Sequence, residues 1–340
     1  MSARRWMKCI DTARCGLAAA AFSLGLSAIT HIAHAGSITA NTATYAGDIT
    51  ALNFPVGSVA VSNYITYRNA GTFYDSNGVA DKTGNLDVVN DIARIDWIAA
   101  EIYGMPLVLS ASLPYGYADN ATLGGQDVST QSAFFSPNLY VTLGLIVDPR
   151  NERTLGISNY VFLPLGDYDS TKDVNVATPG QTVVSPQFAY AEGLGKFSPA
   201  LQNLSIDIFG GAAFHSDGDN PVTTSGAGFD RTEQDDSYDI NLYLRRNWNP
   251  LSFVAIGAEK SWGGEQIATG GVLGAVSGDT SLGKDEYVKG HLQFGVALSE
   301  TLQLAGDFTH DFYREGGFKE DFTAELRIST FILPASGPLK

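Results

Sequence analysis

The sequence predicts an all-β fold: one transmembrane antiparallel up-and-down β-barrel, with twelve strands. Apolar and polar residues alternate with period 2 over many segments, and the connections between these segments alternate between short and long. No apolar run after residue 35 is long enough for a spanning helix. Charged residues make up 17% of the chain, below the roughly 25% of a typical soluble domain. A lipid-facing belt accounts for this low charge.

The first 35 residues are predicted to be a cleaved signal peptide, which directs the chain to the bacterial outer membrane. A basic start precedes the apolar run 16–30, and an A-x-A pattern at 33–35 predicts cleavage near Ala35. Both cysteines of the chain, Cys9 and Cys15, lie in this segment. The remaining chain therefore has no disulfide, and backbone pairing and burial must hold it together.

Twelve segments have the length and the alternation of membrane-crossing strands. They are expected near residues 58–68, 88–103, 106–118, 137–148, 153–163, 182–195, 203–216, 236–248, 251–262, 285–298, 301–314 and 319–332. The barrel domain then spans residues 58–333. Residues 36–57 are predicted to be a periplasmic N-terminal extension, and residues 334–340 a C-terminal tail.

The lengths of the connections distinguish a membrane barrel from a soluble sheet. Short turns such as Gly104–Met105 and Ser299–Glu300 alternate with long polar loops, except for the short 315–319 connection. One rim of the barrel therefore carries short turns, and the other, called the elaborated rim below, carries long loops. Bacterial outer-membrane barrels have this arrangement, with the short turns in the periplasm and the long loops outside. We expect apolar side chains such as Leu292 and Val296 to face lipid, with outer-membrane lipid and lipopolysaccharide as partners.

The charge balance and the loops exclude several classes of function. The chain has 36 acidic and 21 basic residues, and its net charge of −15 argues against nucleic acid as a partner. The loops 215–220 and 232–239 are rich in oxygen ligands, but neither has a calcium-loop spacing. The sequence therefore predicts no metal site and no cofactor.

Two loop regions resemble a known family. The segment 63–78 ("NYITYRNAGTFYDSNG") and the segment 162–190, which contains Pro164, Gly166 and Tyr168, are similar to signatures of the meta-pathway phenol-degradation family of outer-membrane transporters. The resemblance implies a barrel that takes up small hydrophobic or aromatic compounds. One departure is Leu165, where the family commonly has threonine.

Along each strand, every second side chain is expected to point into the lumen, and the polar and aromatic residues at these positions are the candidate solute contacts. Their charges either pair with one another across the lumen, in a purely structural role, or leave a polar path that selects solutes. They are Arg68, Tyr140, Asp207, Asp239, Tyr243, Arg245, Lys289, His291, Gln293, Asp307, Glu325 and Arg327.

Two other classes of function remain open at this stage. Twelve-stranded lipid-hydrolysing enzymes need a histidine, a serine and an orienting residue, and the histidines beyond the leader are His215, His291 and His310. No orienting partner is placed by the pattern, so no catalytic residue is predicted. A structural or adhesive barrel is the other alternative.

Overall fold

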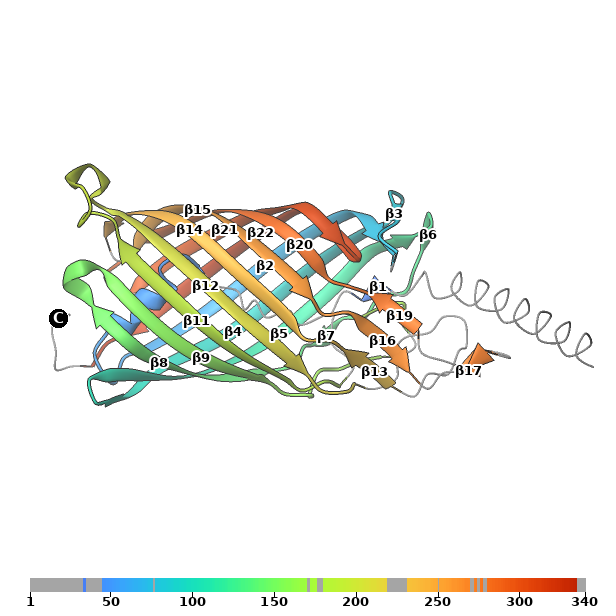
Figure 1. Cartoon of the computed structure of the whole chain (residues 1–340), viewed down its shortest axis with the longest axis horizontal. Coiled ribbons are helices and arrows are strands. Elements are labelled where there is room, and N and C mark those ends of the chain that lie inside the picture. The colour runs from blue at the N-terminus through green and yellow to red at the C-terminus, as the bar shows by residue number, and fades with distance from the viewer. Residues whose placement is uncertain are drawn as a thin grey trace, which may run out of the picture.

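Twelve long antiparallel strands form a closed barrel in the computed structural model, and this architecture confirms the predicted fold class (Figure 1). The structure describes residues 33–34, 45–75, 77–169, 172–175, 180–218, 231–249, 251–269, 272–273, 276–277 and 280–334. The barrel strands are β2 (Val59–Tyr74), β4 (Asn85–Ile102), β5 (Met105–Leu123), β8 (Asn138–Asp148), β9 (Arg153–Phe162), β11 (Val183–Gly193), β12 (Leu204–His215), β14 (Ser237–Asn249), β15 (Ser252–Gly263), β20 (Glu286–Ala297), β21 (Leu302–Glu315) and β22 (Gly317–Ile332). Each strand pairs with its sequence neighbours.

Pairing between the first and last barrel strands closes the sheet. The β2–β22 ladder runs from Val59 opposite Ile332 to Tyr74 opposite Gly317, with irregularities around Ala70. Closure removes the exposed edges that an open sheet would leave in lipid.

Short elements lie mainly beyond the two rims of the barrel. The short strands are β1 (Ala33–His34), β3 (Ala80–Asp81), β6 (Gln126–Asp127), β7 (Ala133–Phe134), β10 (Val174–Asn175), β13 (Arg231–Gln234), β16 (Gln266–Thr269), β17 (Val272–Leu273), β18 (Val276–Ser277) and β19 (Thr280–Gly283). The described residues also form three short 3-10 helices, η1 (Asp48–Asn53), η2 (Pro149–Asn151) and η3 (Pro199–Leu201). Within the described residues, no helix has the length and apolar character needed to cross a bilayer.

The two rims differ as the loop lengths predict. The tight connections β4–β5 and β8–β9 lie at the end where β2 begins and β22 ends, and the short strands β3, β6, β13, β16 and β19 lie at the other end (Figure 1). In the β4–β5 turn, Tyr103 and Gly104 both have positive φ, 52° and 82°. Two successive left-handed residues define the type I′ turn, whose twist matches that of antiparallel strands.

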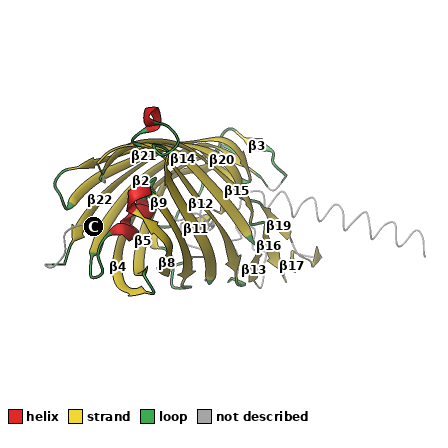
Figure 2. Ribbon diagram, turned by 60° about the vertical axis from the view of Figure 1, so that its left-hand side comes forward, coloured by secondary structure: helices red, strands yellow, loops and turns green. Residues whose placement is uncertain are grey.

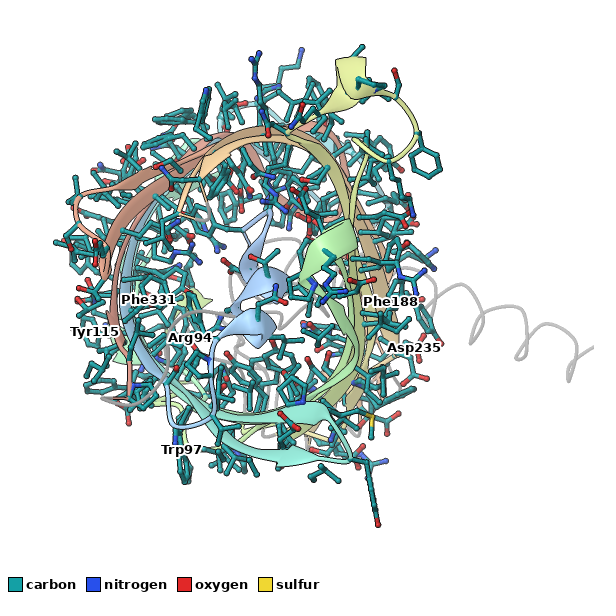
Figure 3. The ribbon with its side chains drawn as sticks, turned by 90° about the vertical axis from the view of Figure 1, so that its left-hand side faces the viewer. Arg94, Trp97, Tyr115, Phe188, Asp235 and Phe331 are labelled. Carbon is teal, nitrogen blue, oxygen red and sulfur yellow. The ribbon has the colours of Figure 1, made fainter. Side chains whose placement is uncertain are left out.

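The outer face of the barrel is an apolar belt. Leu242 is 52% exposed and Ile256 is 59% exposed, and many other large apolar side chains are similarly uncovered. Figure 3, viewed along the barrel, shows Trp97 and Tyr115 on the outside and Arg94 on the inside. Soluble monomers rarely expose contiguous apolar patches of more than a few hundred Å². The belt therefore fits a lipid environment, and the barrel is a transmembrane one.

Residues 45–52 lie inside the barrel. They are part of the range 36–57 for which the sequence predicts a periplasmic extension. Tyr45, Ile49 and Leu52 are 1%, 6% and 5% exposed, and η1 contacts β8, β9 and β11. Figure 2 shows helical turns at the barrel opening, and Figure 3 shows the blue ribbon of this segment inside the ring of strands. Gly156 of β9 makes room for it, because a Cβ atom there would lie 2.8 Å from Cδ1 of Ile49. The segment shows no periodic pattern, so its burial could not be predicted from the sequence.

Some predictions fall outside the described residues. Of the predicted leader, only β1 is described, and it pairs in parallel with β10. The proposed tail is described only at Pro334. Most of the long connection between β12 and β14 also lies outside the described ranges.

Candidate functional site

The predicted lumen residues all lie on the inner face of the barrel, but they do not form one open polar tube. The structure divides most of them into three groups of contacts: one around the N-terminal segment, one around His291, and one near the elaborated rim. A fourth group, on the wall formed by β4, β5, β8 and β9, includes Tyr140 and several residues that the sequence analysis did not select.

The first group holds the N-terminal segment in place. Nη1 of Arg327 lies 2.7 Å and 2.9 Å from the two carboxylate oxygens of Asp48, and the guanidinium lies 4.2 Å from the centre of the Tyr45 ring. The backbone N–H of Ala46 donates a 2.8 Å hydrogen bond to Oε1 of Gln293. Burial raises the pKa of the Tyr45 hydroxyl, so this group stays protonated.

Arg245, on β14, approaches the same segment from another part of the wall. Its guanidinium donates hydrogen bonds of 2.7 Å and 3.1 Å to the carboxylate of Asp207. A Cβ atom at Gly47 would lie 3.0 Å from this guanidinium, and Gly47 has a φ of 88°. Glycine therefore satisfies both the close approach and the left-handed backbone. Four predicted lumen residues (Asp207, Arg245, Gln293 and Arg327) thus hold this end of the lumen together.

The second group is centred on His291. Its Nδ1 lies 2.9 Å from Oδ2 of Asp307 and its Nε2 lies 3.1 Å from Oε2 of Glu259. Carboxylates accept hydrogen bonds, so an imidazole that binds both must donate from both nitrogens and carry a positive charge. Tyr287 donates a 2.6 Å hydrogen bond to Glu259. The ring of Tyr243 stands edge-on to the imidazole, with centroids 5.4 Å apart.

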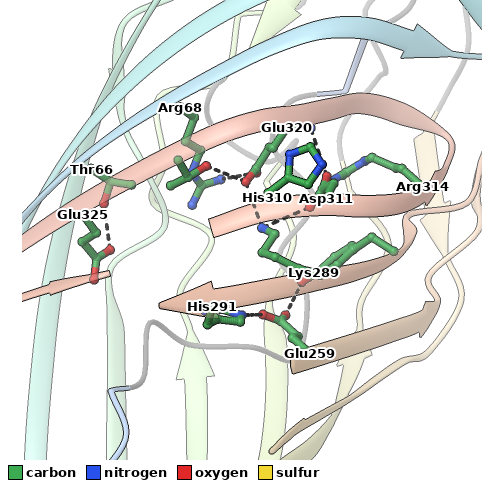
Figure 4. Close-up of polar contacts among 12 residues, drawn as sticks. Thr66, Arg68, Glu259, Lys289, His291, His310, Asp311, Arg314, Glu320 and Glu325 are labelled. Atoms are coloured by element: carbon green, nitrogen blue, oxygen red, sulfur yellow. Dashed lines mark hydrogen bonds and ion pairs between the residues drawn. The ribbon is translucent and has the colours of Figure 1, made fainter. Parts of the chain in front are cut away.

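The third group is an ion-pair network near the elaborated rim, shown in Figure 4. Nζ of Lys289 lies 2.9 Å from Glu320 and 3.8 Å from Asp311. Arg314 lies 3.1 Å from Asp311, and Arg68 lies 3.6 Å from Glu320. The side chain of Arg68 is 44% exposed. It is therefore the most accessible charge in this network, whereas the side chain of Lys289 is 13% exposed.

Glu325 lies apart from these ion pairs on the inner face of β22. Its Oε2 accepts a 2.8 Å hydrogen bond from the hydroxyl of Thr66 on β2 (Figure 4). This contact crosses the seam where the first and last barrel strands meet.

The fourth group lies on the wall formed by β4, β5, β8 and β9. The guanidinium of Arg94 donates a 2.9 Å hydrogen bond to Asp96, which also accepts hydrogen bonds from Ser110 and Tyr140. Arg94 lies 5.0 Å from the centre of the Tyr140 ring. The sequence pattern of this strand is ambiguous because Arg94 and Asp96 share a face with Ile98. The structure places that face inward, with the register shift of β4 and β5 at Ile98–Ala100.

Three aromatic rings extend this wall towards the elaborated rim. Tyr140 and Tyr160 are stacked with centroids 4.1 Å apart, and Tyr160 and Phe162 are stacked at 6.4 Å. All three are buried in one cluster with Val183 and Ala213. Tyr160 and Phe162 point inward from the segment 159–162 ("NYVF"). Apolar or aromatic residues occur at both the inward and the outward positions of this segment, so the alternation is not visible. Sequence reasoning missed them for that reason.

Glu259 and Tyr287 were also missed as lumen residues. Glu259 shares its parity with Ala255 and Gly257, small residues that give no polar stripe. The one available signal was its position directly opposite Lys289 and Asn241 once the strand register is known.

Two of the three histidines considered for catalysis lie away from the groups described above. His310 is on the outer face, and its Nδ1 lies 2.6 Å from the carbonyl oxygen of Asp321. His215 ends β12, which β14, β15 and β20 separate from the strand of His310. In the described ranges, no group of three His, Cys, Asp or Glu side chains is arranged to hold a metal ion.

A hollow of about 800 Å³ lies in the part of the wall that runs from β8 through β9, β11, β12 and β14 to β15. Most of its lining belongs to the outer, apolar face, including Phe188, Ile240 and Trp262. Its floor contains Gly210 and Gly211, which have no side chain to fill it. Three polar residues from the inner face, Ser158, Gln187 and Asp239, also line it.

The geometry defines a class of protein: a transmembrane β-barrel with an apolar exterior and a charged and aromatic interior. Within this class, the chain belongs to the family described as "Putative MetA-pathway of phenol degradation", whose model matches residues 69–327. This match confirms the family resemblance found in the loop signatures. No curated protein matches the sequence.

The chain is similar to several solved structures, of which the first named here shares its fold. An outer-membrane channel from Pseudomonas putida F1 is 24% identical, with a TM-score of 0.70, and the match covers 85% of this chain and 100% of that one. The TodX monoaromatic hydrocarbon channel, as a deletion mutant, is 8% identical over 82% of this chain and 89% of that one, with a TM-score of 0.44. The NanC porin is 10% identical over 80% and 100%, with a TM-score of 0.42.

Proposed function

We propose that this protein is an outer-membrane channel through which small hydrophobic or aromatic compounds enter by passive or facilitated diffusion. The observation that carries the proposal is the stacked aromatic wall of Tyr140, Tyr160 and Phe162 inside a closed barrel. Aromatic rings in offset stacks give a solute ring a favourable contact without binding it so tightly that it cannot leave. Membership of a family named for phenol degradation supports the same class of solute.

The proposal includes the location and orientation of the barrel. The predicted leader would be removed near Ala35, and the chain would insert with its tight turns in the periplasm and its elaborated rim outside. The apolar belt would contact membrane lipid, and the acidic outer loops would lie among lipopolysaccharide. The charged groups around His291 and Lys289 are internally paired, so no cofactor and no catalytic step are part of the proposal.

Single-channel recording in planar bilayers tests this function. The purified barrel should conduct ions, and toluene added on the side of the elaborated rim should interrupt the current in a concentration-dependent manner. A sugar of similar size serves as the polar control and should interrupt it much less. A barrel that conducts no ions with any solute, or one that toluene and the sugar block equally, contradicts the proposal.

A further inference from the structure

Three side-chain oxygens on the inner face of β14 and β15 have no hydrogen-bond partner within the described part of the chain. They are Oγ of Ser237, Oδ1 of Asp239 and Oγ of Ser261. The three residues are 3%, 6% and 0% exposed. The other carboxylate oxygen of Asp239 accepts a 3.0 Å hydrogen bond from Asn241. Buried polar atoms are normally paired, so three unpaired acceptor oxygens together indicate a place where a ligand donates a hydrogen bond.

The strand register brings these oxygens together. Asp239 lies directly opposite Ser261 in the β14–β15 ladder. Residues in that relation have Cβ atoms about 5 Å apart on one face of the sheet. Ser237 lies two residues along β14 and therefore projects on the same side. Asp239 also takes part in none of the salt bridges found among the described residues, unlike Asp207, which pairs with Arg245.

A glycine on the neighbouring strand lies directly beside Asp239. Gly211 of β12 is the register partner of Asp239. A Cβ atom at this position would lie 3.3 Å from Oδ1 of Asp239 and 2.8 Å from Cγ of Gln187. Any side chain at Gly211 would therefore crowd the unpaired carboxylate oxygen.

The aromatic cluster adjoins the three oxygens. Ala213 is the register partner of Ser237 and belongs to the buried cluster that contains Tyr160, Phe162 and Val183. Neighbouring strands are about 4.8 Å apart. An apolar, aromatic wall thus meets a patch of hydrogen-bond acceptors within the dimensions of one substituted benzene ring.

We propose that Ser237, Asp239 and Ser261 form a binding site for the hydroxyl group of a hydroxylated aromatic solute. The solute ring packs against the Tyr160–Phe162 cluster, and its O–H donates to the Asp239 carboxylate. A carboxyl oxygen accepts such a hydrogen bond, and a ring without a donor cannot form it. The site therefore selects phenol over toluene, whose ring is similar but has no donor. This inference rests on the proposed transport function and names the solute class.

The test compares current block by phenol and by toluene in planar bilayers, for the wild-type chain and for Asp239→Asn. The amide keeps the shape, but its oxygen stays on Asn241 and its NH2 group replaces the acceptor Oδ1. The dissociation constant for phenol should therefore rise about tenfold while that for toluene stays unchanged. Ser261→Ala should raise the phenol constant about threefold. The matched controls are Ser62→Ala, an inner-face serine that bonds Ser329, and Asp119→Asn at the exposed end of β5.

The outcomes separate this site from the transport function. If neither solute interrupts the wild-type current, the transport function is wrong. If both solutes do, but Asp239→Asn leaves the ratio of the phenol and toluene constants unchanged, the binding site is wrong. Should Asp239→Asn fail to insert, Gly211→Ala decides: it should weaken block by phenol and leave block by toluene intact, and an unchanged phenol constant refutes the site.

Discussion

The carboxylate of Asp48 and the guanidinium of Arg327 lie 2.7 Å apart and join the segment that precedes the first barrel strand to the last barrel strand. The two residues are 279 positions apart in sequence. Their side chains are 21% and 7% exposed, so the pair is shielded from solvent. The N-terminal segment is thus an integral part of the lumen, and its position can be changed by substitutions at either end of the chain.

Asp48→Ala should release the N-terminal segment from the lumen. Removing one partner of a buried ion pair leaves the other charge uncompensated, which should weaken docking by roughly 3 kcal/mol. The chain after the predicted leader has no cysteine, so a Leu52→Cys substitution provides a unique label. A thiol reagent should modify this cysteine about a hundredfold faster in the Asp48→Ala background. Asp75→Ala, a substitution at the distant rim, is the control, and equal labelling rates in both backgrounds contradict the prediction.

His291→Gln should lower the stability of the folded barrel. Glutamine cannot supply the positive charge between Asp307 and Glu259, so two buried carboxylates lose their shared partner at a cost of roughly 3 kcal/mol. The temperature at which the folded barrel converts to the unfolded form during heating in detergent measures the effect. His310→Gln, which changes the histidine on the outer face, is the matched control and should leave this temperature unchanged. Equal temperatures for the two variants would show that the bridge contributes nothing.

The barrel itself could be predicted from the sequence because lipid imposes one simple rule on every strand. Most outward side chains in the membrane are apolar, so period 2 is visible in segments such as 139–147 and 240–244. The alternation of turn lengths then fixes which rim is which. These signals are local in sequence, and no knowledge of side-chain contacts is needed to read them.

The contents of the lumen could not be predicted to the same extent. Parity identifies inward residues such as Lys289 and His291, but whether they pair depends on residues from other strands and on register. Burial of Tyr45 and Ile49 depends on the shape of the closed barrel, and their segment has no periodicity of its own. Glu259 was missed for a related reason, since small residues flank it on its face of β15.

Leu242→Arg should destabilise the barrel by an amount that depends on depth in the bilayer. Leu242 lies near the middle of β14 on the outer face and is 52% exposed. Arginine at the midplane of a membrane barrel costs roughly 2–4 kcal/mol. Tyr103→Arg, in the β4–β5 turn, should cost less than about 1 kcal/mol because that position lies beyond the hydrocarbon region. Folding into lipid vesicles along a urea series measures both. Equal losses would contradict the assignment of the outer face to lipid.

Tyr160→Leu should weaken block of the channel by aromatic solutes in general. The substitution keeps an apolar side chain but removes the ring that stacks on Tyr140 and Phe162. An aromatic pair contributes about 1 kcal/mol beyond its buried area. The dissociation constants for toluene and for phenol should therefore rise together, by about fivefold. Single-channel block measures both.

Phe188→Leu provides the control for Tyr160→Leu, because it removes a ring from the outer face, where Phe188 is 43% exposed (Figure 3). It should leave both dissociation constants unchanged if solutes travel along the lumen wall. The common effect of Tyr160→Leu on both solutes also distinguishes the ring contact from the Asp239 site, which should act on phenol alone. If Phe188→Leu weakens block and Tyr160→Leu does not, solutes contact the lipid-facing side of the wall, and the lumen is not their path.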